Sequence, residues 1–283
     1  MRSTVPYDPR HSRIPEVSAV GLLGRAVIER ARRASLLLST LGGAALAPYT
    51  PGKAAARVVR RVLLMQIFYT GFQALGLVST IGVLLGATIV IQTELMVPSA
   101  DSALIGKVLV AVVLRELAPL ITAIVVAGRS GTAIATELGN MKVSSEILAL
   151  SSLGIDPPRF VVMPRLTATA LSVVILMVYF AGVALAGTIG VGRVLANVSF
   201  EALRGGVSAA LTPYDLPLFV MKGFGLGTIV GWFCCHYGLQ VKSSPTEVPQ
   251  MASRGVVMSL VGCVAFNTFA TAIFYWTVGP SLR

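Results

Sequence analysis

Charged residues are scarce in this sequence, and their distribution is uneven. Lys, Arg, Asp and Glu make up 12% of the 283 residues, and hydrophobic residues make up 55%. Soluble domains average about 25% charged residues. The stretches 62–93, 166–192 and 255–282 contain no charged residue at all. Each is longer than the roughly 20 residues that a helix needs to cross a bilayer, so an ordinary soluble fold is excluded.

Familiar catalytic motifs are missing as well. The sequence has no G-x-x-x-x-G-K-[ST] phosphate loop, no H-E-x-x-H, no G-x-S-x-G and no C-x-x-C. Cys234, Cys235 and Cys263 lie in apolar stretches, without histidines at ligand spacing. We therefore expect neither a metal nor a cofactor. Because the phosphate loop and the other catalytic motifs are missing, we also expect a non-catalytic membrane subunit. Any ATP hydrolysis would then take place in a separate partner subunit.

Two further apolar stretches carry isolated charges. One is 103–127, with Lys107 and the adjacent Arg115 and Glu116, and the other is 216–241, with Lys222. Counting both gives five spans. Backbone groups in lipid must be satisfied within the segment, so we predict an all-α polytopic membrane protein. The formal net charge of +11 does not indicate nucleic acid, because the basic residues lie beside the spans, where anionic lipid headgroups explain them.

The basic residues also predict the orientation. Eleven Lys and Arg residues precede the first span, against three acidic ones, so residues 1–61 are expected on the cytoplasmic side. Five crossings then place the C-terminus on the periplasmic side and the 193–213 loop outside. Within 1–61, apolar and basic positions alternate over 17–41, which indicates an amphipathic helix in the membrane interface. The remaining residues, 62–283, form the predicted membrane domain.

A short helix is predicted over 142–153, on the cytoplasmic side between the second and third spans. Its apolar residues recur at helical spacing, at Val143, Ile147, Leu150 and Leu153. Gly154 and the prolines after it end the helix. So short a helix is not stable alone and needs a partner surface.

Arg115 and Glu116 are the leading functional candidates, because charges inside a membrane are costly and usually face protein or a cavity. Neighbours in a helix diverge by about 100°, so each is expected to find a partner elsewhere. Lys222 and Lys107 are expected to extend to the membrane surface. Gln92 and Glu94, at the end of the first span, are candidates for a cavity mouth. Spaced glycines such as Gly82-x-x-x-Gly86 predict close helix packing.

The segment 114–165 resembles the MlaE/YrbE permeases of ABC transporters that work with MCE-domain proteins in lipid traffic. It contains R-E-L-x-P, A-G-R-x-G-[ST]-A, E-[LI]-G-x-M and a D-P…P-R ending, in that order. The resemblance implies a homodimer in the inner membrane, with phospholipid as substrate, two cytoplasmic ATPase subunits and an MCE-domain ring on the outer face.

The resemblance also implies roles for individual residues. Arg115 and Glu116 would lie by the lipid cavity. Gln92 and Glu94 are further candidates along the lipid path, from their position at the outer end of the first span. The 142–153 helix would dock into the ATPase. The expected coupling residues are Arg129, Glu137, Val143, Glu146, Ile147 and Leu150.

Two other functions remain open. An ion-coupled secondary transporter would use Glu116 to take up a proton. The chain could instead be a purely structural anchor for an outer protein ring.

Overall fold

The computed structural model describes residues 53–96, 102–155, 157–195, 199–242 and 244–278. Every element in these residues is helical, which confirms the all-α prediction. The expected interfacial helix at 17–41 lies outside the described residues. The elements are α2 (Lys53–Met96), α3 (Ser102–Val108), η2 (Leu109–Leu117), α4 (Ala118–Val126), η3 (Ala127–Gly131), α5 (Thr132–Val143), α6 (Glu146–Ser152), η4 (Pro158–Val162), α7 (Met163–Leu195), α8 (Phe200–Ala210), α9 (Asp215–Leu239) and α10 (Glu247–Val278).

Five helical runs are long and apolar enough to cross a membrane, as the sequence predicts. They cover Ile67–Met96, Ala103–Val143, Phe160–Val194, Asp215–Leu239 and Glu247–Thr277. The second run is continuous from α3 to α5 but contains two π-helical segments, η2 and η3. A π-helix is a wider turn than an α-helix and occurs often at functional sites. The η2 segment carries Arg115 and Glu116.

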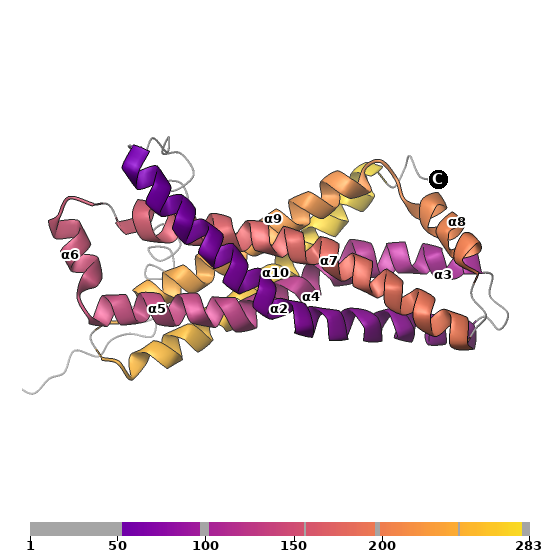
Figure 1. Cartoon of the computed structure of the whole chain (residues 1–283), viewed down its shortest axis with the longest axis horizontal. Coiled ribbons are helices and arrows are strands. Elements are labelled where there is room, and N and C mark those ends of the chain that lie inside the picture. The colour runs from indigo at the N-terminus through magenta and orange to yellow at the C-terminus, as the bar shows by residue number, and fades with distance from the viewer. Residues whose placement is uncertain (1–52, 97–101, 156, 196–198, 243, 279–283) are drawn as a thin grey trace, which may run out of the picture. The chain divides into compact units, whose positions relative to one another are not determined.

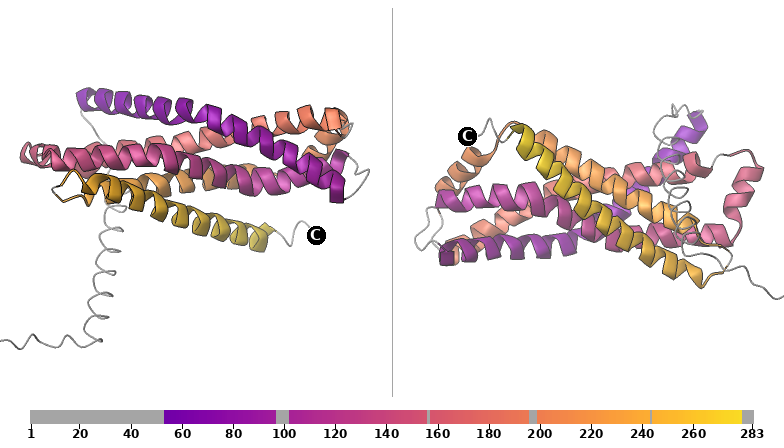
Figure 2. Two further views of the ribbon diagram at one scale, coloured as in Figure 1. Left: turned by 90° about the horizontal axis from the view of Figure 1, so that it is seen from below. Right: turned by 180° about the vertical axis from the view of Figure 1, so that it is seen from behind.

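The spans run alongside one another, with α6 at one end and α8 at the other (Figure 1). The two views of Figure 2 show α10 on the face of the bundle opposite α2. The end of the bundle that carries α6 is called here the α6 end, and the end that carries α8 is called the α8 end.

Glycines let α2, α7 and α9 approach closely, as predicted. A Cβ on Gly86 of α2 would lie 2.8 Å from the backbone nitrogen of Thr188 on α7. A Cβ on Gly227 of α9 would lie 2.5 Å from the Cα of Ala170, also on α7. Only a residue without a side chain fits at such distances, so α7 packs tightly between its two neighbours.

The α8 helix is a feature that the sequence analysis missed, since 193–213 was expected to be a loop. It lies along α3, and the two backbones touch at glycines. A Cβ on Gly106 would lie 2.8 Å from the nitrogen of Val207. The chain therefore turns back along α3 before α9 begins at Asp215. This return places the first residue of α9 beside Arg115 rather than beside the start of α3.

Candidate functional site

The site begins with a break in regular α-helical hydrogen bonding. Pro119 has no backbone N–H, so it cannot donate to the carbonyl oxygen four residues earlier, which belongs to Arg115. That oxygen instead accepts a hydrogen bond of 2.7 Å from Nζ of Lys222. The R-E-L-x-P sequence thus frees a backbone acceptor beside its two charged residues. A cation from α9 binds to it.

Arg115 forms a two-pronged ion pair with Asp215. Its Nε donates to Oδ1 at 2.8 Å and its Nη2 donates to Oδ2 at 3.0 Å. Thr212 donates to the same carboxylate from its backbone nitrogen at 2.7 Å and from its hydroxyl at 2.9 Å. The Arg115 guanidinium also lies 5.7 Å from the ring centre of Phe274 on α10. Such bidentate pairs are strong and fix geometry, so Arg115 ties η2 to the start of α9.

Glu116 has a different set of partners. Its Oε1 accepts from Lys222 at 3.2 Å and from the Thr271 hydroxyl at 2.8 Å, while Oε2 accepts from Asn267 at 2.8 Å. Nζ of Lys222 also donates to the Thr271 hydroxyl oxygen at 2.7 Å. Glu116 therefore joins η2 to both α9 and α10. As predicted, the neighbouring charges Arg115 and Glu116 find partners elsewhere.

Arg115, Glu116, Asp215 and Lys222 are called here the charge cluster. The cluster contains two positive and two negative side chains, so its formal charge is zero. Lys222 is fully buried, with 0% of its surface exposed, so the expectation that it extends to the membrane surface is wrong. Buried charges are tolerated only where partners and hydrogen bonds compensate them, as they do here.

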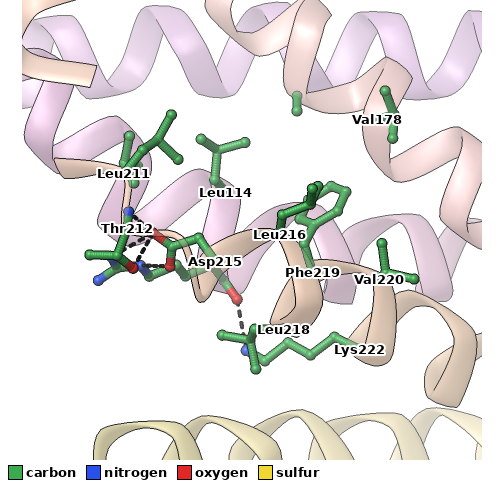
Figure 3. Close-up of a pocket in the computed structure, with 13 residues that line it drawn as sticks. Leu114, Val178, Leu211, Thr212, Asp215, Leu216, Leu218, Phe219, Val220 and Lys222 are labelled. Carbon is green, nitrogen blue, oxygen red and sulfur yellow. Dashed lines mark hydrogen bonds and ion pairs between the residues drawn. The ribbon is translucent and has the colours of Figure 1, made fainter. Parts of the chain in front are cut away.

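A cavity of about 430 Å³ lies against the charge cluster, between η2, α7 and α9. It is called here the α7–α9 cavity. Figure 3 shows Thr212 and Asp215 at one side of it, and Val178 and Val220 toward the other. The lining is otherwise mostly aliphatic. The arrangement can therefore receive an apolar group, and its polar atoms are concentrated at one side.

The other two lipid-path candidates lie apart from the charge cluster. Gln92 lines a second cavity of about 380 Å³, between α2 and the α3–η2 run, together with Thr88, Thr93 and Leu117. Glu94 is half-buried and is not among the residues that line either cavity. The structure thus brings together Arg115 and Glu116, but not Gln92 and Glu94.

The expected helix at 142–153 is shorter than predicted. The α5 helix ends at Val143, and Ser145 adopts the left-handed conformation, with φ 60°, before α6 begins at Glu146. Gly154 ends the segment with φ 73°, as its sequence position predicts. Val143 therefore belongs to α5. Glu146, Ile147 and Leu150 belong to α6, where Leu150 packs against the core while Leu148 is 67% exposed.

The other two coupling candidates, Glu137 and Arg129, each connect two helices. Glu137 of α5 forms an ion pair of 2.7 Å with Arg165 of α7. Arg129 of η3 donates to both the backbone oxygen and the side-chain oxygen of Gln73 on α2. The Glu137–Arg165 ion pair thus joins α5 to α7, the two helices between which the chain passes through α6.

Sequence reasoning missed Asp215, Lys222, Asn267 and Thr271 as members of the site. Asp215 and Lys222 carried a usable signal, because a charge in or beside an apolar span needs a partner and the four charges sum to zero. Asn267 and Thr271 lie four residues apart on α10, hence on one face of that helix. Nothing in the sequence alone pairs that face with η2.

Five apolar helices long enough to cross a membrane, with a compensated charge cluster between η2, α9 and α10, define a multi-pass membrane protein. Comparison with known proteins makes this more specific. The family model described as "Permease MlaE" matches residues 63–273. The Arabidopsis thaliana protein TRIGALACTOSYLDIACYLGLYCEROL 1, chloroplastic, is 30% identical over 83% of this chain and 69% of its own length.

Two bacterial relatives are similar over more of their length. The Haemophilus influenzae "Intermembrane phospholipid transport system permease protein MlaE" is 26% identical over 92% of this chain and 98% of its own. A Synechocystis "Probable ABC transporter permease protein" is 29% identical over 80% and 86%. The chain belongs to the MlaE permease family. The five apolar helices and this membership identify a multi-pass inner-membrane permease.

Proposed function

We propose that this chain is the permease subunit of an ABC transporter that moves phospholipid, or a similar lipid, between membranes. The family membership supports this, as does the name of the Haemophilus influenzae relative, an intermembrane phospholipid transport system permease protein. The observation that carries the proposal is an apolar cavity within the spans that borders a compensated charge cluster. A lipid needs apolar walls for its tails and a few polar groups for its headgroup, and this cavity offers both.

The proposed complex contains a cytoplasmic ATPase, an MCE-domain protein on the outer face and a second copy of this chain. Residues 1–61 would then be cytoplasmic, with an interfacial helix, and the C-terminus periplasmic. A second copy would pack on α10, which has the smallest buried share of the five spans, at 22%. Its exposed apolar side chains include Val261, Phe269 and Trp276, at 59%, 64% and 84%.

The ATPase is proposed to bind at α6. Leu148 and Leu153, which are 67% and 75% exposed, offer apolar contacts at the α6 end. Leu148→Asp should release a co-purifying ATPase subunit, because a buried charge would replace an apolar contact. Asn140→Asp, at an exposed position on α5 and outside α6, is the control for a general effect of adding an exposed charge. Full retention of the ATPase by the Leu148 variant would remove α6 from the coupling role.

The transport test uses the chain with its co-expressed partners in proteoliposomes that contain a fluorescent phospholipid. The proposal expects ATP-dependent lipid transfer to acceptor vesicles, and no ATP hydrolysis by the purified chain alone. The alternative, an ion-coupled transporter that uses Glu116, expects transfer driven by a pH gradient without ATP. Lipid transfer that needs only the pH gradient would overturn the proposal. Transfer that survives both Arg115→Ala and Glu116→Ala at full rate would favour a structural anchor.

A further inference from the structure

The α7–α9 cavity is formed entirely within one copy of the chain. Its walls come from the η2 segment and from α7 and α9, together with the turn that precedes α9. Each of these helices belongs to a run that is long and apolar enough to span a membrane. All of its lining residues therefore belong to one copy, and none of them lies on α10, where a second copy is proposed to pack.

The mouth of the cavity faces the surroundings of the protein with apolar side chains. Val178 of α7 and Leu216 and Val220 of α9 are 60%, 72% and 45% exposed, and all three line the cavity. Inside a bilayer the surroundings of such residues are acyl chains, since the hydrocarbon core holds no water to fill a hollow. The natural occupant is thus part of a lipid.

The polar groups at the cavity are already matched with one another. Thr212 and Asp215 lie at one side of the cavity (Figure 3) and are hydrogen-bonded to each other. Asp215 also pairs with Arg115, and Lys222 is bonded to Glu116. Because these charges compensate, the site has no net charge to hold a free ion. It does offer polar atoms beside which a headgroup can lie while an apolar chain fills the rest.

The size of the cavity argues against a membrane helix of a partner protein as its occupant. One turn of a helix with its side chains, about 10 Å wide and 5.4 Å long, takes up about 400 Å³. A cavity of about 430 Å³ would hold a single turn of such a helix. A helix crossing the membrane needs a groove several turns long, whereas one acyl chain is narrow enough to enter.

We propose that the α7–α9 cavity binds one acyl chain of a membrane lipid within a single protomer, with the lipid's polar end beside Thr212 and the Arg115–Asp215 pair. The chain enters laterally between α7 and α9. The inference deepens the proposed function: that the bound lipid lies on the transport path rests on that function. The binding itself requires neither ATP nor a partner subunit.

The test compares two positions on the same helix. The photoreactive amino acid p-benzoyl-phenylalanine replaces either Val178, which lines the cavity, or Ile175, which is similarly exposed at 51% but does not line it. The full chain is reconstituted in nanodiscs of phosphatidylethanolamine and phosphatidylglycerol, transferred to detergent, washed and irradiated. The yield of lipid adduct is measured by intact mass spectrometry. A lipid held in a site survives the wash, and a loosely surrounding lipid does not.

The expected result is a lipid adduct at position 178 about tenfold above that at position 175. Ala181→Trp, which fills the cavity from the α7 side, should remove that excess, and Val220→Trp should do the same from α9. Leu171→Trp, on α7 but outside the cavity, should leave it unchanged. Melting curves of all the variants separate loss of the site from loss of folding.

Equal adduct at positions 178 and 175 overturns the proposal, and so does an excess at 178 that both filling variants leave intact. In the complete complex, a protein adduct at 178 in place of lipid would show that a partner helix occupies the cavity, which also overturns it. These results leave the proposed function standing, because transport is not measured. Conversely, lipid retention at 178 without ATP-driven transfer overturns the proposed function alone.

Discussion

Replacing Lys222 by Met tests whether the charge cluster holds the fold together. Met keeps a long apolar side chain but removes the ammonium group. Nζ of Lys222 makes three hydrogen bonds, to the Arg115 backbone oxygen, to Glu116 and to Thr271. Without it, the Arg115 oxygen loses its α9 donor and Glu116 loses its cation. Breaking a buried ion pair by removing one partner costs about 3–5 kcal/mol.

The lower end of that range is expected here. Glu116 keeps its hydrogen bonds to Thr271 and Asn267, and its side chain is 33% exposed, so some compensation remains. A loss of about 3 kcal/mol corresponds to a fall in melting temperature of about 6–12 °C in a chain of this size. Thermal unfolding of the detergent-solubilised protein, followed by circular dichroism, measures it.

A double-mutant cycle separates the ion pair from its surroundings. Glu116→Gln keeps the shape of the side chain and removes its charge, so the combined variant with Lys222→Met leaves no lone charge from this pair. The coupling energy should be about 1–3 kcal/mol, and the combined variant should be more stable than the sum of the single effects. A Lys222→Met protein that melts like the parent, or strictly additive effects, would refute the reasoning.

Three smaller changes have equally definite expectations. Gly206→Val should destabilise the protein by about 1–3 kcal/mol, because the new side chain would meet the α3 backbone. The control is Gly205→Val, where an added Cβ meets nothing within 4 Å and no destabilisation is expected. Melting temperatures of the two variants test the difference. Thr212→Val should cost about 1 kcal/mol, because it removes one hydroxyl bond to Asp215, and chemical denaturation should show it. Pro119→Ala supplies an N–H that competes with α9 for a backbone oxygen of η2, so lipid transfer should fall while the helical circular-dichroism signal stays unchanged; transfer at the parent rate would contradict this.

The spans could be predicted because a bilayer imposes a length and a composition that single sequences display openly. All five lie where the charge-free or nearly charge-free stretches indicate. The glycine contacts between α2 and α7 were predicted for a related reason, since Gly82-x-x-x-Gly86 is a local pattern. The break at Ser144 and Ser145 was missed, because a left-handed residue inside an apolar periodicity leaves little trace unless it is a glycine.

The error over Lys222 has a definite physical origin. Its place near the start of a span suggested that it lay near the membrane surface. However, α8 returns along α3, and α9 starts beside Arg115, which is thirteen residues after Ser102 and hence about 20 Å along the helical run. Lys222 lies about two turns further into α9. How deep Lys222 lies in the bundle depends on the α8 helix, which brings the chain back along α3. No local sequence pattern indicates that return.

Lys222 is the residue at which the charge cluster and the α7–α9 cavity meet. Its Nζ belongs to the cluster, and the residue is also among those lining the cavity. Long cationic side chains combine an apolar stem with a charged head, so the two roles can be separated by substitution. Lys222→Met keeps most of the stem and should lower stability while lipid stays bound at the photoreactive position 178. Lys222→Ala removes the stem as well and should lower both. If both variants release lipid equally, the ammonium group rather than the apolar wall retains the acyl chain, and the division between cluster and cavity drawn from the contacts is wrong.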